Sequence, residues 1–113
     1  MVYSDSTTWE NWSWSTTADF ASTAQVYSGT HAISVTHTQA WGALSLRKSS
    51  AITTTGYQYL SFYAYGGTGG TQLRVYTQDS GNNESSYYNI DVAEGTWSHI
   101  TVTLAQLGNP AEI

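Results

Sequence analysis

The feature that most constrains this chain is a two-residue alternation of apolar and polar side chains. It recurs in short runs, and turn-forming residues separate one run from the next. Successive side chains of a β-strand point to opposite faces, so each run predicts a strand with one face toward a core and one toward water. The predicted strands lie within His31–Thr38, Trp41–Arg47, Tyr59–Tyr65, Gln72–Gln78, Ser85–Val92 and Trp97–Leu104. Helical periodicity is almost absent, and many short strands at even spacing favour a β-sandwich or a β-barrel.

The alternation also predicts which side chains face the core. In the run Tyr59–Tyr65, Leu60, Phe62 and Ala64 share the expected core face, and the tyrosines share the other. The corresponding inward positions of the other runs are Ile33, Val35, Leu44, Leu46, Leu73, Val75, Thr77, Tyr88, Ile90, Val92, Ile100, Val102 and Leu104. His31 and His37 match Ile33 and Val35 in parity, which predicts that they are partly buried. A single helical turn is expected at Ala105–Leu107.

Size and charge exclude several classes of function. The chain has 113 residues, which suits one domain spanning residues 1–113. Three basic and eight acidic residues give a net charge of −5, so binding to nucleic acid or to anionic lipid is not expected. The sequence holds no cysteine and no apolar run as long as a membrane helix. The segment Met1–Asp5 has neither a basic nor an apolar stretch, so no signal peptide is expected in it.

Aromatic side chains occupy strand positions that are predicted to face water. The chain contains five tryptophans and nine tyrosines but only two phenylalanines. If neighbouring strands align, the water-facing rings lie beside one guanidinium and two amides. The predicted set is Trp41, Tyr63, Tyr65 and Tyr76, with Gln72, Arg74 and Gln78. Rings that stack on the C–H face of a sugar, next to groups that bond its hydroxyls, need no net charge. Tyrosine also pairs across strands for structural reasons, but large rings gathered on one exposed face favour a binding function.

A denser group of tryptophans lies nearer the N-terminus. Trp12 and Trp14 are two residues apart and would share a face if they lie in one strand. We expect them to extend the aromatic platform from its edge, and we expect at least one of Trp9, Trp12 and Trp14 to be structural. Trp97, which opens a predicted strand, is expected in the core.

No catalytic constellation is evident. A glycosidase needs two carboxylates facing each other across a cleft, and most acids here lie in predicted turns. The histidines have no metal-binding spacing, and the chain has no GxSxG elbow. Gly66–Gly70 lacks the features of a phosphate loop, and Asp79–Glu84 is better read as a hairpin turn than as a calcium loop. Two alternatives to a non-catalytic binding module stay open, namely a small β-sandwich glycosidase or lyase and a structural assembly domain.

Several segments together resemble a known family. They are Asn11–Trp14, Ser28–Val35, Trp41–Leu46, Tyr59–Tyr63 and Gly95–Val102. The chain resembles the jelly-roll carbohydrate-binding modules appended to secreted bacterial glycoside hydrolases. The resemblance implies an antiparallel β-sandwich that binds a neutral plant cell-wall polysaccharide, with the β-glucan type favoured, and often holds a structural calcium ion. It also implies an extracellular location, as part of a secreted enzyme.

The end of the chain departs from this family. Members continue past the segment that corresponds to Leu107–Pro110 with one or two further strands and an acidic pair, whereas this sequence stops at Ile113. The resemblance therefore predicts a β-sandwich that is truncated at its C-terminus. If the calcium site is present, Asp5 is the first residue expected to be one of its ligands. The resemblance also predicts an unprotected sheet edge, and hence a homo-oligomer formed by strand pairing or exchange with a second copy.

Overall fold

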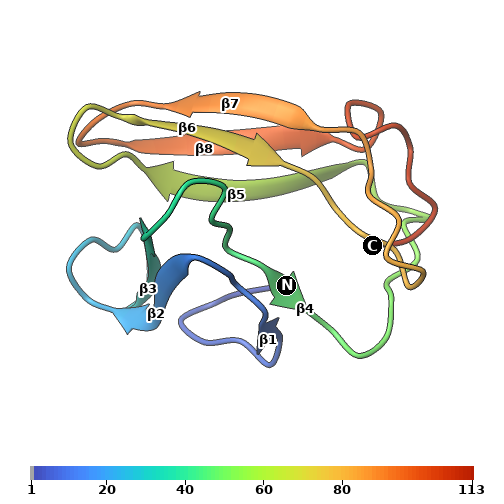
Figure 1. The fold of residues 1–113 in the computed structure, drawn as a ribbon, viewed down its shortest axis with the longest axis horizontal. Coiled ribbons are helices and arrows are strands. Elements are labelled where there is room, and N and C mark those ends of the chain that lie inside the picture. The colour runs from blue at the N-terminus through green and yellow to red at the C-terminus, as the bar shows by residue number, and fades with distance from the viewer. Residues whose placement is uncertain (1) are drawn as a thin grey trace. The chain divides into compact units, whose positions relative to one another are not determined.

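The computed structural model describes residues 2–113 and contains β-strands but no helix in that range (Figure 1). The prediction of an all-β chain is therefore confirmed. The strands are β1 (Glu10–Asn11), β2 (Thr16–Ser22), β3 (Ala32–His37), β4 (Leu46–Arg47), β5 (Tyr59–Tyr65), β6 (Thr71–Val75), β7 (Tyr88–Val92) and β8 (Trp97–Thr103). They form four two-stranded antiparallel ladders, β1–β4, β2–β3, β5–β8 and β6–β7.

The chain divides into two compact units, which are described in turn. The N-terminal unit ends at Ser49, and the C-terminal unit comprises Ser50–Ile113. Each unit contains two of the ladders: β1–β4 and β2–β3 in the first, and β5–β8 and β6–β7 in the second.

The N-terminal unit is held together mainly by its ladders and by side-chain bonds to the backbone. In β2–β3, Thr16 lies opposite His37, and the register shifts between Asp19 and Ser22. The Tyr3 hydroxyl donates a hydrogen bond of 2.7 Å to the carbonyl of Phe20 on β2. This bond fastens the segment before β1 to the longer ladder.

The strand predicted in this unit is wrong in its extent, and two further features of the unit were not predicted. The strand predicted at Trp41–Arg47 shrinks to Leu46–Arg47, with one isolated bridge between Trp14 and Ala43. The positive φ of Trp41, 66°, interrupts the extended backbone. Trp12 and Trp14 do not share a strand, because β1 ends at Asn11. Strand β2 was not predicted, because its small and polar residues give only a weak alternation.

Several side chains of this unit that were predicted to face the core are exposed to solvent. Val35 and Leu44 are exposed, contrary to the prediction, and His37 is exposed as well, whereas His31 is half-buried. Among the unit's described residues, no apolar side chain is fully buried, and the buried residue there is Ser22. A two-stranded ladder of short, Thr/Ser-rich strands offers too little apolar area to bury its own inner face.

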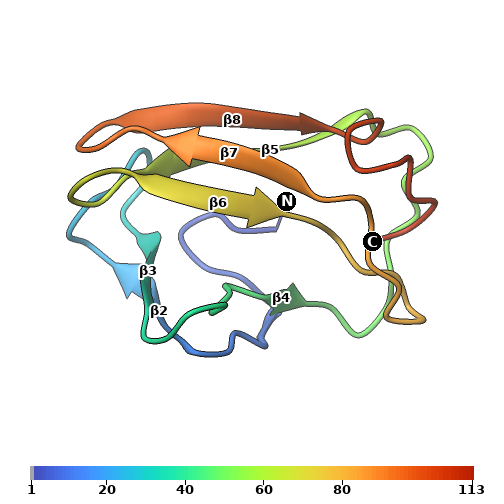
Figure 2. The ribbon, with the colours of Figure 1, turned by 45° about the horizontal axis from the view of Figure 1, so that its top comes forward.

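The C-terminal unit follows the predicted pattern closely. In β5–β8, Tyr59 lies opposite Thr103 and Tyr65 lies opposite Trp97, with continuous antiparallel pairing between them. Figure 2 shows β6 and β7 running in opposite directions as neighbours, with Thr71 opposite Val92. The fully buried apolar side chains among the described residues, Val92, Val102 and Leu107, all lie in this unit.

The alternation of burial on β5 matches the prediction as far as Ala64, whereas Tyr65, predicted to face water, is half-buried. Leu60, Phe62 and Ala64 are at least half-buried, whereas Tyr59 and Tyr63 are exposed. Trp97 is half-buried rather than fully in the core. The predicted strands at Gln72–Gln78 and Ser85–Val92 are shorter than expected.

The shortening reflects the loop between them. Two hydrogen bonds join Thr77 and Ser85. The Ser85 N–H donates to the Thr77 carbonyl at 2.8 Å, and the Thr77 N–H donates to the Ser85 hydroxyl oxygen, Oγ, at 2.9 Å. A side-chain bond thus replaces one backbone bond of the ladder, and the regular strands end at Val75 and begin at Tyr88.

The end of the chain is tied back to the start of the same unit. Ile52 and Ile113 exchange two backbone hydrogen bonds of 2.7 and 2.9 Å. Residues 104–108 form hydrogen-bonded turns, with the Leu107 N–H 3.3 Å from the Thr103 carbonyl, so the helical turn expected at Ala105–Leu107 is present as a single turn. No segment of residues 2–113 forms a helix that could cross a lipid bilayer.

Candidate functional site

The outer face of the β5–β8 ladder carries the first group of aromatic side chains. Tyr59 is 57% exposed and Tyr63 is 43% exposed. The Tyr63 ring stacks on His99 of β8, with centroids 4.5 Å apart and planes 13° from parallel. Tyr65 and Trp97 follow as a tilted, half-buried pair with centroids 5.4 Å apart. The register therefore sets rings side by side along the ladder.

The rest of this face is polar but uncharged. Neither β5 nor β8 contains Asp, Glu, Lys or Arg. Ser61 lies opposite Thr101, and both are exposed, as is Thr103 opposite Tyr59. Hydroxyl groups thus alternate with rings on this face. The face carries no Asp, Glu, Lys or Arg side chain, although the protein as a whole has a net charge of −5. A ligand held here meets apolar ring faces and neutral hydrogen-bonding groups.

A second group lies at the end of the β6–β7 ladder, where Tyr76 follows β6 and Tyr87 precedes β7. Tyr76 contacts Tyr87 with ring centroids 5.0 Å apart, and the Arg74 guanidinium lies 4.9 Å from the Tyr87 ring centroid. Arg74 Nε also donates to Asn89 Oδ1 at 3.4 Å. The contacts of Arg74 with the Tyr87 ring and the Asn89 amide hold its guanidinium in place before any ligand binds.

The hydroxyl of Tyr87 donates a hydrogen bond to the Glu84 carboxylate. This bond, above all other causes, raises the pKa of Tyr87 above its ordinary value of 10.0. Gln72 is exposed opposite Asp91, whereas Gln78 lies beyond the strand in a bridge with Glu84.

A third group lies in the N-terminal unit and centres on Trp41. Its side chain is 85% exposed, and its backbone has a φ of 66°. Trp14 Nε1 donates to the Trp41 carbonyl at 2.8 Å. The next residue, Gly42, approaches so closely that a Cβ there would lie 2.3 Å from the Ser15 carbonyl oxygen. The loop is therefore packed at its backbone while the Trp41 ring stands in water.

Trp12 is 54% exposed and has a different environment. The Arg47 guanidinium lies 4.2 Å from its ring centroid, and its Nε1 donates to Glu10 Oε2 at 2.7 Å. The same carboxylate oxygen pairs with Arg47 Nη1 at 3.3 Å. Arg47 thus lies over the ring, and more than half of the side chain is still exposed. Trp9 is half-buried, with Lys48 Nζ 5.8 Å from its ring, as expected for the structural member of the group.

The predicted binding residues come from both units, and each unit is considered by itself. Trp12, Trp14 and Trp41 lie in the N-terminal unit. Tyr63 and Tyr65 lie on β5, Gln72 and Arg74 lie on β6, and Tyr76 follows directly after β6. The alignment expected between Tyr63 and Tyr76 is not formed by strand pairing, because β5 pairs with β8 and β6 pairs with β7. Sequence reasoning missed Tyr59, His99 and Tyr87 as members, although Tyr59 shares the parity of Tyr63.

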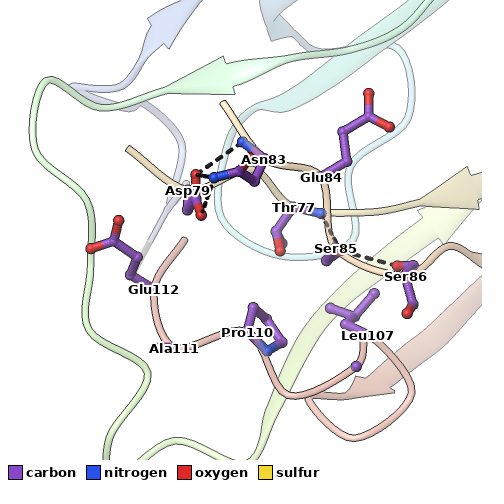
Figure 3. A pocket seen from close by; sticks show the side chains of 11 residues that line it. Thr77, Asp79, Asn83, Glu84, Ser85, Ser86, Leu107, Pro110, Ala111 and Glu112 are labelled. Carbon is purple, nitrogen blue, oxygen red and sulfur yellow. Dashed lines mark hydrogen bonds between the residues drawn. The ribbon is translucent and has the colours of Figure 1, made fainter. Parts of the chain in front are cut away.

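The C-terminal unit also holds a pocket of about 300 Å³ near the end of the chain (Figure 3). Asp79, Glu84 and Glu112 contribute carboxylates to its lining. Asp79 Oδ1 accepts the N–H groups of Gly81 and Asn83 at 2.8 and 2.9 Å, and Glu112 accepts the Ser80 N–H at 3.0 Å.

These bonds fix the role of the acids in the pocket. The hydrogen bond from the Asn83 N–H is the main cause that lowers the pKa of Asp79 below 3.8. Glu84 points away from Asp79 in Figure 3 and accepts the Tyr87 hydroxyl. The carboxylates therefore serve chiefly to hold the loop between β6 and β7.

Asp5, the predicted calcium ligand, also holds backbone. Its Oδ1 accepts the N–H groups of Thr30 and His31 at 2.9 and 3.0 Å, and these bonds lower its pKa below 3.8, that from His31 most. At Gly29, whose φ is 73°, a Cβ would lie 2.3 Å from Asp5 Oδ1, so a larger residue would displace the carboxylate. Among residues 2–113 there is no cluster of three or more His, Cys, Asp or Glu side chains suited to a metal ion. The N–H donors around Asp5 are not ligands that calcium takes.

Comparison with known proteins adds no assignment. Protein-family models, curated proteins and solved structures were all compared with the chain, and none of them matches. The likeness to carbohydrate-binding modules therefore rests on the residues of this chain alone.

Proposed function

We propose that this protein binds a neutral plant cell-wall polysaccharide, of the β-glucan type, without catalysing a reaction on it. The observation that carries the proposal is the outer face of β5–β8. There exposed tyrosines alternate with hydroxyl groups, and both strands lack charged residues. Such a face matches a sugar chain, which presents apolar C–H patches and neutral hydroxyls in alternation. It offers little to a nucleic acid or to a charged peptide.

The size of the expected affinity follows from the rings. A stacked aromatic contact contributes about 0.5–1.5 kcal/mol beyond the area that it buries. A few such contacts give dissociation constants in the range of roughly micromolar to millimolar. Tyrosine loses little conformational freedom on binding because it has two side-chain torsions. Stacking of Tyr63 on His99 restrains the Tyr63 ring further before a ligand arrives.

The N-terminal unit offers exposed tryptophans of its own. Trp41 is the most exposed of the large apolar side chains among the described residues, and its backbone is fixed. We assign Trp41 and the exposed part of Trp12 to glycan contact, with Trp14 as the residue that holds the Trp41 loop. On and directly after β6, we assign Gln72, Arg74 and Tyr76 as polar and aromatic contacts, and Gln78 extends them.

Affinity electrophoresis tests the proposal. The parent protein is run through gels that contain hydroxyethylcellulose, mixed-linkage glucan, xyloglucan, galactomannan, xylan or laminarin. Tyr63→Ala and Trp41→Ala run beside it, and Tyr27→Ala, which removes a similarly exposed ring elsewhere, is the matched control. Retardation by a glucan that is lost in Tyr63→Ala and kept in Tyr27→Ala supports the proposal. Equal mobility of the parent in every gel contradicts it.

The state of the carboxylates favours binding over hydrolysis. A general acid of a glycosidase needs a raised pKa so that it holds a proton. The pKa of Asp79 is lowered instead, and Glu112 is engaged by Ser80. We expect no reducing ends to appear when the purified protein is incubated with any glycan that it binds, and steady release of them would support the glycosidase alternative.

We also propose a jelly-roll β-sandwich as the arrangement of the ladders, and secretion as part of a larger enzyme as the cellular context. The support is the antiparallel pairing of the four ladders, together with the resemblance of five segments to such modules. A crystal structure checks the sandwich, and a parallel or open arrangement of the sheets would contradict it.

A second candidate function is self-assembly. Val35 and Leu44 are exposed on the N-terminal unit, and every ladder consists of two strands, which leaves strand edges available for pairing. A second copy could cover these edges by pairing or exchanging strands. Sedimentation velocity over a hundredfold range of concentration tests it, because assembly predicts a rising sedimentation coefficient and a purely binding module predicts a constant one.

A further inference from the structure

We infer that His99 determines the specificity of the β5–β8 face: once its imidazole is protonated, the face also binds β-glucan chains in which some sugars are glucuronate units. The inference rests on the proposed glycan-binding function and adds an acidic class of ligand to the same site. His99 lies on β8 opposite Tyr63 of β5, and Figure 1 shows the two strands side by side. A sugar unit that contacts Tyr63 therefore has its substituents within reach of the imidazole.

On β5 and β8, His99 is the one side chain of a type that ordinarily changes charge between about pH 5 and 8. Residues 49–73, which include β5, hold no Asp, Glu, Lys, Arg or His, and residues 95–111, which include β8, hold His99 alone of these five types. The first acid before β8 is Glu94, which bridges to Gly66 beyond the end of the paired strands. Phenols ionise only in alkaline solution, and they are the other titratable groups on this side of the ladder, namely Tyr59, Tyr63 and Tyr65.

The stack between His99 and Tyr63 can accommodate a positive charge. The two ring centroids are 4.5 Å apart and the planes are 13° from parallel. A cation within about 6 Å of a tyrosine ring centroid is attracted by the ring, so protonation keeps the imidazole in place. The ring nitrogens lie on the edge of the imidazole, which stacking does not cover. His99 is exposed, and no hydrogen bond within residues 2–113 engages these nitrogens.

Protonation changes what the imidazole offers to a ligand. The neutral ring has one donor and one acceptor, which suit a sugar hydroxyl, whereas the protonated ring has two donors and a positive charge. A glucuronate carboxylate then accepts a charge-assisted hydrogen bond, which is roughly twice as strong as a neutral one. The net charge of −5 opposes an anionic chain, but salt screens such repulsion beyond about 8 Å, and a direct contact with His99 is screened less.

Isothermal titration at about pH 8 and about pH 5.5 tests the inference, because imidazole changes charge between these values while sugar carboxylates stay ionised. The ligands are cellohexaose and cellohexaose whose C6 hydroxyls are oxidised to carboxylates. From the higher to the lower pH, the affinity of the parent for the oxidised ligand is expected to rise about fivefold or more. Its affinity for the unoxidised ligand is expected to change less than about twofold, since a hydroxyl can bond either form of the ring.

Three variants locate the effect. His99→Asn stays neutral and is expected to lose the dependence on pH. His99→Arg keeps a planar cation that stacks on Tyr63 and is charged at both values, so it is expected to bind the oxidised ligand equally well at both. His37→Asn, which removes an exposed histidine from the N-terminal unit, is the matched control and is expected to behave like the parent.

The outcomes separate the inference from the proposed function. If the parent binds cellohexaose but gains no affinity for the oxidised ligand at the lower pH, the inference is overturned and the proposed function stands. A gain of the same size in His99→Asn also overturns the inference, because the charge then acts elsewhere. If the parent binds neither ligand at either pH, both the inference and the β-glucan assignment are overturned.

Discussion

At the scale of single residues, Trp41 combines two costly features. Its φ of 66° lies in the left-handed region that large side chains rarely adopt, and its ring is 85% exposed. A strained backbone of this kind costs roughly 1–3 kcal/mol and persists only where surrounding contacts impose it. Here the contacts are the bond from Trp14 Nε1 and the close packing of Gly42 on Ser15. A large ring that is exposed to solvent, on a backbone held in a strained conformation, is typical of a residue that binds a ligand.

Replacement of Trp41 by glycine should therefore have little effect on stability. Glycine relieves the strain at positive φ, which stabilises the folded state. It also raises the entropy of the unfolded chain, which lowers the free energy of unfolding, so the two effects oppose each other. We expect Trp41→Gly to change the free energy of unfolding by less than about 1 kcal/mol, as measured by urea denaturation. A loss of several kcal/mol would mean that the ring packs against the protein rather than serving a ligand.

Asp5 and Asp79 should make stability depend on acid pH. Backbone N–H groups lower the pKa of both carboxyls in the folded state below the unfolded value of 3.8. The stability that they contribute is fully present above the unfolded pKa and is lost as the pH falls through the lower folded values. Urea denaturation at a series of pH values should show this loss below about pH 4.

The variant Asp5→Asn separates the charge from the hydrogen bonds. The amide oxygen can still accept from Thr30 and His31, so the variant is expected to fold but to lose less stability on acidification than the parent. Asp91→Asn removes an exposed carboxylate from β7 and is the matched control. Identical pH profiles for Asp5→Asn and the parent would contradict the role assigned to Asp5.

At the scale of elements, β5 has two faces with different tasks. Phe62 lies on the half-buried side and Tyr63 on the exposed side, although they are neighbours in sequence. Phe62→Ala should lower the free energy of unfolding by about 2 kcal/mol or more, because it removes packed apolar volume. Tyr63→Ala should cost about 1 kcal/mol, chiefly the contact with His99. Urea denaturation of both variants checks this order, and the reverse order would show that the faces are assigned wrongly.

The hydrogen bond between Tyr87 and Glu84 gives the β6–β7 ladder a spectroscopic marker. Because the phenol donates to a carboxylate, its pKa is raised above 10.0 in the folded state. Its contribution to stability is therefore present below pH 10 and is lost as the pH rises through the folded value. In an ultraviolet titration, Glu84→Gln should shift one tyrosine to lower pH, and coincident curves for the two proteins would contradict the bond.

At the scale of the whole molecule, the sequence predicts some parts well and others poorly, for identifiable reasons. The bounds of β5 follow from its strict alternation, and those of β8 are predicted to within one residue. In contrast, β2 has no strong apolar pattern, and the positive φ of Trp41 depends on contacts made by Trp14 and Ser15 across the fold. Local patterns carry no information on such distant contacts.

The candidate site shows the same division. The sequence indicates that exposed tyrosines share one side of β5, because parity alone decides it. It does not indicate which strand pairs with β5, since pairing depends on the whole chain. The prediction therefore joined Tyr63 to Tyr76, whereas the ladder joins Tyr63 to His99.

The most direct test of the central claim is a nuclear magnetic resonance titration of the isotopically labelled protein with the glucan that retards it. The account predicts amide shifts concentrated in Tyr59–Tyr65 and Trp97–Thr103, with the side-chain signals of Tyr63 and His99 among the most affected. Shifts confined to residues outside the β5–β8 ladder, or spectra unchanged at saturating glucan, would contradict it.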